Sequence, residues 1–259
     1  MIRLAAVGDV HFDRDSKGRI ADYHDDISLG SDIFLLAGDL TQTGHPEEAQ
    51  VLVDDLAQIR VPVVAVLGNH DYHLGKEREI KAMLEGVGVS VLEGSSVVLS
   101  VRGAAVGIAG IKGFGGGFSG ACASEFGELE MKEFIRYTKQ GANLLRESLV
   151  SLDTPYKVAL LHYSPVGETL LGEKREIYPF LGSYLLAEAV DEGKADIAFH
   201  GHAHKGVERG LTAGGVPVRN VAQPVIRHVC NIYTIDKEGI KCAQNMARRE
   251  TPSPPQDRL

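Results

Sequence analysis

Five apolar stretches of strand length each stop at a polar group. They are rich in Val, Ile, Leu and Ala and cover residues 2–7, 33–37, 61–67, 158–161 and 197–199. Continuous apolar runs of this kind are typical of parallel strands that are buried on both faces. Because ligands collect where parallel strands deliver their carboxyl ends, we expect the polar residues after these runs to meet at one place.

A helix is predicted between the second and third runs. It begins at Pro46, because Pro is tolerated in the first turn and two glutamates follow it, where carboxylates oppose the positive end of the helix dipole. Apolar residues then recur at helical spacing as far as Ile59. Residues 33–67 therefore read as a β-α-β unit, whose right-handed crossover places Asp39 and Asn69 at the same edge of neighbouring strands.

The alternation of strand and helix changes in the second half of the chain. Residues 97–101 and 105–111 predict a hairpin, since only a short turn separates them. Residues 125–150 are charged and favour a helix, which Gly141 is expected to break or kink. Two further strand-like runs follow before residue 236. The pattern predicts a mixed α/β fold.

Two connecting segments are open to more than one interpretation. The glycine-rich residues 113–120 could be a mobile loop at the rim of a site, a phosphate contact through backbone N–H groups, or a structural turn. They lack the Lys-Ser/Thr of a P-loop. Residues 164–183 are longer than an ordinary connection and could select a substrate or be a plain surface loop.

The polar groups after the five runs are of metal-binding type. They are Asp9, His11, Asp39, Asn69, His70, Asp71, His162, His202 and His204. Carboxylate, imidazole and amide without thiolate suit Mn, Fe or Zn and disfavour a structural zinc finger. The set is larger than one tetrahedral site can use, which indicates two divalent ions. A lone His is more often a hydrogen-bonded core or surface residue, and this is the interpretation we prefer for His45, His73, His200 and His228.

The order of these groups carries a resemblance to a known family. The blocks Gly-Asp-x-His, Gly-Asp, Gly-Asn-His-Asp, a lone His and Gly-His-x-His follow one another from Gly8 to His204. In this the chain resembles the calcineurin-like metallophosphoesterases. The resemblance, together with the predicted hairpin, implies a four-layer α-β-β-α sandwich, in which two mixed β-sheets are flanked by helices.

The resemblance also implies a role for each residue. Asp9, His11 and His204 would bind the first ion, Asn69, His162 and His202 the second, and Asp39 would bridge them. The implied reaction is hydrolysis of a phosphomonoester or phosphodiester by a hydroxide that bridges the two ions. His70 would act as the general acid for the leaving group, with Asp71 as a second catalytic candidate.

One position departs from the family pattern. Many members carry an Asp three residues after the bridging Asp, where it orients the catalytic His, whereas this chain has Gln42. Either Asp71 or a water takes over this role, or His70 is less strongly tuned and the favoured leaving group is an easier one.

Composition limits the domain organisation and the partners. The 259 residues, of which 44% are hydrophobic, can bury a sizeable core, and we expect one phosphoesterase domain over residues 1–243. Residues 244–259 are rich in Pro and polar residues and predict a disordered tail. The net charge of −8, without a basic stripe, argues against nucleic acid and favours a small soluble phosphate ester as substrate.

The three cysteines and the N-terminus indicate the compartment. Cys122, Cys230 and Cys242 have no C-x-x-C spacing, so we expect reduced thiols in the cytoplasm, with a Cys230–Cys242 disulfide as the alternative. No signal peptide and no membrane span is readable, so no membrane partner is expected. The sequence leaves the oligomeric state open.

Two other function classes compete with a phosphoesterase. A non-catalytic protein-binding module on the same metal-binding fold is the first, and the intact His70 and Asn69 count against it. An unrelated dinuclear hydrolase, such as a metallo-β-lactamase-like enzyme, is the second. Such enzymes place the His-x-His block near the first metal-binding strand, whereas here it comes last, at His202.

Overall fold

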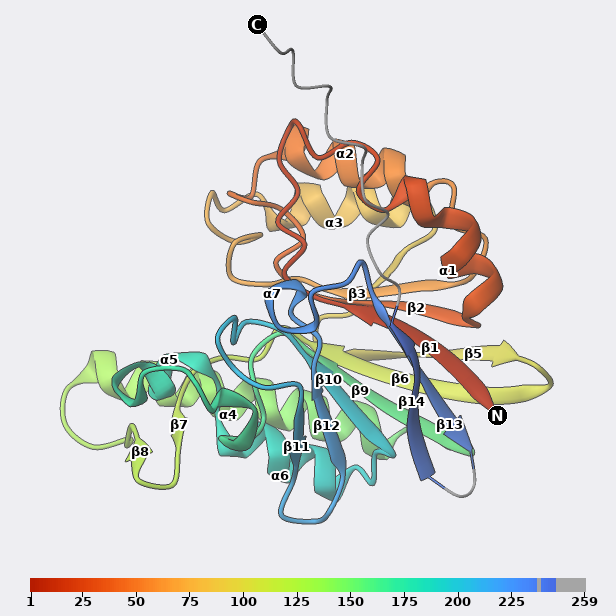
Figure 1. The fold of residues 1–259 in the computed structure, drawn as a ribbon. Coiled ribbons are helices and arrows are strands. Elements are labelled where there is room, and N and C mark those ends of the chain that lie inside the picture. The colour runs from red at the N-terminus through yellow and green to blue at the C-terminus, as the bar shows by residue number, and fades with distance from the viewer. Residues whose placement is uncertain (237–238, 246–259) are drawn as a thin grey trace, which may run out of the picture.

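Two six-stranded mixed sheets pack face to face, and helices cover both outer faces (Figure 1). The structure is a computed structural model that describes residues 1–236 and 239–245. The predicted four-layer α-β-β-α sandwich is confirmed.

The first sheet carries the N-terminal strands. Its order is β14 (Gly239–Asn245), β13 (Asn231–Asp236), β1 (Ile2–Val7), β2 (Ile33–Ala37), β3 (Val63–Val66) and β4 (Ser90–Val91). Strands β1 to β4 are parallel, and β13 and β14 extend the sheet in antiparallel pairs. The outer face is covered by α1 (His24–Gly30), α2 (Pro46–Leu56) and α3 (Glu77–Gly86).

The second sheet is built from the later half of the chain. Its order is β11 (Arg209–Leu211), β12 (Pro217–Asn220), β10 (Ile197–His200), β9 (Tyr156–Leu161), β6 (Ala104–Ile111) and β5 (Ser95–Val101). The four central strands are parallel, and β5 forms the predicted hairpin with β6. The outer face is covered by α4 (Leu129–Val150) and α6 (Tyr184–Glu192).

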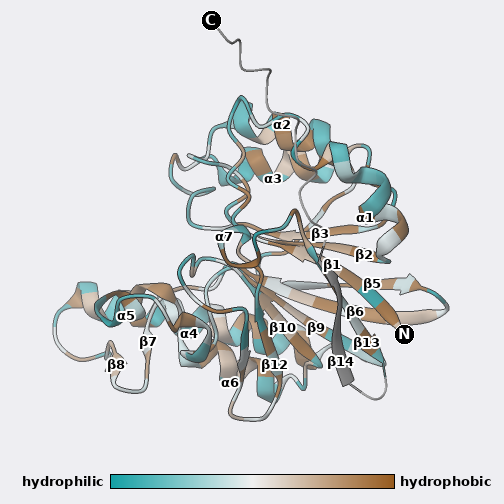
Figure 2. Cartoon of the chain, in the orientation of Figure 1, coloured by the Kyte–Doolittle hydropathy of each residue, from teal (hydrophilic) through white to brown (hydrophobic). Residues whose placement is uncertain are grey.

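The apolar residues form three layers, and this explains why the strands do not alternate in sequence. Along β1, Leu4 packs in the layer between the two sheets, whereas Ala5 packs in the layer under the helices. Figure 2 shows mostly brown, apolar residues along the central strands, whereas α1 and α2 carry many teal, polar residues. A strand between two apolar layers must be hydrophobic at every position.

The smaller elements lie in the connections. They are η1 (Ala21–Tyr23), β7 (Gly117–Phe118), β8 (Ala121–Cys122), η2 (Glu168–Leu170), η3 (Arg175–Ile177), α5 (Tyr178–Leu181) and α7 (Gln223–Ile226). The glycine-rich stretch packs against α5: Gly116 N–H donates to the Pro179 carbonyl at 2.7 Å. A Cβ on Gly115 would lie only 2.3 Å from the same oxygen. These contacts favour the structural-turn interpretation of residues 113–120.

The prediction that Gly141 breaks its helix is wrong. Helix α4 runs without interruption through Gly141, because Leu145 and Leu149 bury its apolar face against the second sheet. One glycine costs a helix only about 1 kcal/mol, which such packing outweighs. Tyr137 and Leu144, on the same helix, are exposed.

Of the predicted C-terminal tail, residues 244 and 245 belong to β14, and the remainder lies outside the described residues.

Among the helices of residues 1–236, none combines the length and the apolar character that crossing a bilayer requires.

Candidate metal centre

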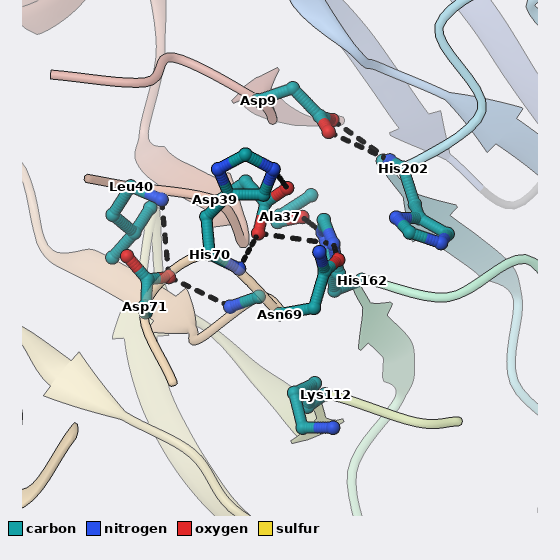
Figure 3. A network of polar contacts seen from close by, with 12 residues as sticks. Asp9, Ala37, Asp39, Leu40, Asn69, His70, Asp71, Lys112, His162 and His202 are labelled. Carbon is teal, nitrogen blue, oxygen red and sulfur yellow. Dashed lines mark hydrogen bonds and ion pairs between the residues drawn. The ribbon is translucent and has the colours of Figure 1, made fainter. Parts of the chain in front are cut away.

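The predicted ligands come together in a shallow region where the strands of both sheets end (Figure 3). Three overlapping groups have all their ligand atoms within 4.8 Å of one another: Asp9, His11 and His204; His11, Asp39 and His70; and Asp39, His162 and His202. The loops that carry them follow β1, β2, β3, β9 and β10. The five strand ends therefore converge as the sequence predicted.

Asp39 lies at the middle of this cluster. Its Oδ1 is 3.3 Å from Nε2 of His162, and its Oδ2 is 3.9 Å from Nε2 of His11 and 4.0 Å from Nε2 of His70. The backbone N–H of His70 donates to Oδ1 at 2.8 Å. The Asp39 carboxylate thus faces both halves of the cluster. The hydrogen bond from His70, in the loop after β3, fixes its position.

The two halves differ in their remaining contacts. On one side, Nε2 of His204 lies 2.9 Å from Oδ1 of Asp9. On the other, Nε2 of His162 lies 2.9 Å from Oδ1 of Asn69, while its Nδ1 lies 3.0 Å from the carbonyl of Ala37 and donates to it. That second bond sets the tautomer and leaves Nε2 of His162 as the atom that can bind a metal.

His11 provides the test of whether a metal fits. Both of its ring nitrogens are buried and, among the described residues, neither has a hydrogen-bond partner. A buried polar atom without a hydrogen bond lowers the free energy of unfolding by about 1–3 kcal/mol. The arrangement therefore requires an ion or another group that binds these nitrogens. Burial also lowers the pKa of His11 to about 4 and that of His202 to about 3. Neutral imidazole is the form that binds metals, so the residues fit divalent ions.

Burial and charge also shift the pKa values of the contacting pair Asp9 and His204. Burial raises the pKa of Asp9 to about 6, and its contact with His204 opposes this shift. The same contact raises the pKa of His204. A nearby cation would stabilise the carboxylate form of Asp9, as metal binding requires.

Backbone strain is concentrated in the same loops. Asp9, His11, Asp39 and His202 all have positive φ, between 42° and 69°. Non-glycine residues seldom adopt this region, and such residues cluster at functional sites where the surroundings hold them. The pattern of residue types does not reveal this strain.

Two glycines of the motif are required by close approach. A Cβ on Gly68 would lie 2.1 Å from Oδ1 of Asp39, and a Cβ on Gly201 would lie 2.2 Å from Oδ2 of Asp9. The glycines therefore let the loops after β3 and β10 pack directly on the carboxylates that follow β2 and β1.

Asp71 and His70 have different surroundings. The carboxylate of Asp71 is fully buried and accepts hydrogen bonds from the backbone of Leu40, Thr41 and Gly68 and from the Thr41 hydroxyl. Asp71 therefore joins the loop after β2 to the loop after β3. None of these hydrogen bonds involves the His70 ring. Nδ1 of His70 lies instead 2.6 Å from the backbone carbonyl of Gln42.

Two residues of this region were missed. Lys112 follows β6 directly and lies beside Asn69 and His162 (Figure 3). The strand-end signal that found the other residues would have found it. Tyr163 packs its ring 4.3 Å from that of His202. His200, in contrast, is a hydrogen-bonded core residue as expected: its Nε2 lies 2.9 Å from the Thr169 hydroxyl.

Comparison with protein families agrees with this geometry. The profile of the calcineurin-like phosphoesterase family matches residues 2–206. The chain belongs to this family. Like the family, this phosphoesterase is a metal-dependent hydrolase of phosphoric esters.

Solved structures share the fold of this phosphoesterase at low sequence identity. Phosphopantetheinyl hydrolase from Mycobacterium tuberculosis is 18% identical, with a TM-score of 0.61, over 85% of this chain and 88% of that one. A putative 5'-nucleotidase from Staphylococcus aureus is 16% identical, with a TM-score of 0.58, over 99% of this chain and 56% of that one. No curated protein matches the phosphoesterase in sequence.

Proposed function

We propose that this phosphoesterase holds two divalent ions, Mn, Fe or Zn, and hydrolyses a phosphomonoester or phosphodiester of a small soluble molecule. The proposed ligands are Asp9, His11 and His204 for one ion, Asn69, His162 and His202 for the other, and Asp39 for both. The observation that carries the proposal is that both ring nitrogens of His11, in the middle of this ligand set, are buried and have no hydrogen-bond partner among the described residues.

When bound, the two ions would neutralise the charge of the phosphate oxygens and make water acidic enough to be a nucleophile near neutral pH. Soft thiolate ligands do not occur in the set, which agrees with Mn, Fe or Zn in an oxygen and nitrogen site.

His70 is the proposed general acid. Its Nδ1–H is donated to the Gln42 carbonyl, so the opposite nitrogen, Nε2, faces the cluster and lies 4.0 Å from Asp39. The imidazolium form carries a second proton on Nε2, and this proton can be donated to the leaving oxygen of an ester bound at the centre, which leaves the neutral imidazole. Asp71 acts as a positioning residue, because its three hydrogen bonds with Leu40 and Thr41 hold the loop that carries His70 against the loop that carries Asp39.

The substrate and the compartment follow from charge and composition. A net charge of −8 provides no long-range attraction for a polyanion, so the proposal excludes nucleic acid and favours a small phosphate ester. The sparse cysteines support a cytoplasmic location.

The test combines metal analysis with turnover. We expect elemental analysis and anomalous scattering to find two ions per chain, and para-nitrophenyl phosphate or its bis ester to be hydrolysed in the presence of Mn, Fe or Zn. Loss of activity with a chelator and its return on adding the ion would support the proposal. A protein that binds two ions but hydrolyses neither ester with any of them would be the non-catalytic binding module instead.

A further inference from the structure

Lys112 is a buried cation that forms no salt bridge with the described residues. Its side chain is only 8% exposed. Within residues 1–236, its ammonium makes one long hydrogen bond, 3.4 Å from the Gly113 carbonyl, and no salt bridge. Burial lowers the pKa of Lys112 to about 8, so the ammonium form is less favoured here than in water. Buried charges are normally paired, and an unpaired one calls for an explanation.

Four aromatic rings surround this ammonium. Nζ of Lys112 lies 5.0 Å from the ring centres of Tyr72 and Phe114, 5.2 Å from that of Tyr163 and 5.6 Å from that of Tyr137. Cation–π attraction to the faces of such rings favours the ammonium at this position. The rings keep the cation in place and partly offset its desolvation, but they do not neutralise it.

The same residues line a cavity of about 210 Å³. Lys112, Tyr72 and Tyr137 are among its walls, and so is Glu93. The carboxylate of Glu93 already accepts from the Tyr72 hydroxyl at 2.6 Å and from Lys81 at 2.8 Å. Of the two charged residues that line the cavity, Glu93 has a direct ion pair, whereas Lys112 feels Asp39 and Glu93 only at longer range. A cavity of ~150 Å³ admits benzene, so this one has room for a single substituted ring.

The cavity adjoins the metal centre through two of its walls. Tyr72 stands two residues after His70 in the same loop. The carbonyl of Lys112 accepts from the backbone N–H of His162 at 3.1 Å, and the charge of Asp39 acts on the Lys112 ammonium. Figure 3 shows Lys112 below Asn69 and His162. The cavity therefore borders the loop that carries His70, through Tyr72, and the loop that carries His162, through Lys112.

We propose that this cavity binds an aromatic part of the substrate and that Lys112 selects a flat ring carrying a negatively charged substituent. The aromatic walls suit the ring, and the ammonium, which forms no salt bridge among the described residues, suits the anion. The inference rests on the proposed phosphoesterase function and narrows its substrate class to anionic aromatic esters. Lys112 is then a specificity-determining residue.

Direct binding tests the cavity without relying on turnover. The probes are 4-hydroxybenzoate and 4-hydroxybenzamide, which have nearly the same shape and differ in charge, and ligand-observed NMR gives their dissociation constants. We expect the wild-type protein to bind the benzoate about tenfold more tightly than the benzamide. Lys112→Met should remove this preference, whereas Lys76→Met, which alters an exposed lysine at the start of α3, should keep it.

Each other outcome has a definite meaning. Equal binding of the two probes to wild type overturns the proposal, and so does a preference that survives Lys112→Met, because the carboxylate would then bind elsewhere, for instance at the metal centre. If Lys112→Met does not fold, Phe114→Leu replaces it: this variant keeps the cation and should weaken both probes equally, and unchanged affinities overturn the proposal.

The subsite and the proposed function can fail separately. Hydrolysis of phosphate esters with no Lys112-dependent preference removes the subsite and keeps the enzyme. A Lys112-dependent preference in a protein that hydrolyses no ester keeps the anion-binding cavity and removes the catalytic function.

Discussion

The backbone carbonyl of Gln42 lies 2.6 Å from Nδ1 of His70 and holds the ring of the proposed general acid. The sequence left three possibilities for the Asp that many family members carry at this position: Asp71 or a water takes over its role, or His70 is less strongly tuned. A main-chain oxygen is present whatever residue occupies position 42. The departure from the family pattern therefore leaves the orientation of His70 intact.

His70→Ala should lower kcat for phenyl phosphate, a poor leaving group, by about 100-fold, since general acids contribute 10²–10⁴. It should lower kcat for para-nitrophenyl phosphate less and leave the metal content unchanged. The matched control is Gln42→Ala, which keeps the carbonyl that binds Nδ1 and should change kcat by less than about threefold. Equal losses on both esters, or a large loss in Gln42→Ala, would contradict the assigned role.

Asp39→Asn should release metal and activity together. The carboxylate faces His11, His70 and His162, so a neutral amide weakens the attraction for both ions at once. Elemental analysis after dialysis measures the effect. Asp54→Asn, an exposed change on α2, serves as the control and should retain both ions. Two ions per chain in Asp39→Asn would show that Asp39 does not serve as the shared ligand.

Gly201→Ala should damage the metal centre although it adds one methyl group. The new Cβ would lie 2.2 Å from Asp9 Oδ2 and 2.9 Å from the Ala37 carbonyl. We expect a loss of about 1–3 kcal/mol in the free energy of unfolding and weaker metal binding, because overpacking moves the neighbouring groups.

The matched control for that change is Gly86→Ala, at the end of α3, where a Cβ would meet nothing within 4 Å. There the expected change is neutral or a gain of roughly 0.4–1 kcal/mol, because Ala lowers the entropy of the unfolded chain. Thermal and urea unfolding measure both variants. Similar effects of the two alanines would rule out the close approach at Gly201.

His200 should make the metal-free protein less stable at acid pH. Burial lowers the pKa of His200 to about 3, against about 6.5 in the unfolded chain. Between these values the unfolded state binds the extra proton, so the free energy of unfolding falls as pH falls, by about 1.4 kcal/mol per pH unit for this group.

The variant His200→Gln isolates that contribution. At pH 7 it is expected to be less stable than wild type, but the gap between the two should shrink by about 2 kcal/mol when both are measured at pH 5 in chelator. Urea unfolding at the two pH values measures the gap. A gap that does not change with pH would mean that His200 is not held neutral.

The sequence by itself determined the strand ends and the chemistry gathered there. Continuous apolar runs predicted parallel strands, and Asp9, Asp39, Asn69 and the histidines after them predicted the metal-binding type of the site. This worked because burial on both faces and the choice of metal ligands both constrain residue identity.

Only the tertiary structure decided what holds and surrounds those groups. The support of His70 comes from a backbone oxygen, which no residue type reveals, and Gly141 stays helical because the second sheet packs against α4. The burial of Lys112 among four rings depends on strands and loops far apart in the sequence. Contacts made through space by main-chain atoms and by packing leave little trace in a local pattern of side chains, and it is these contacts that shape the site.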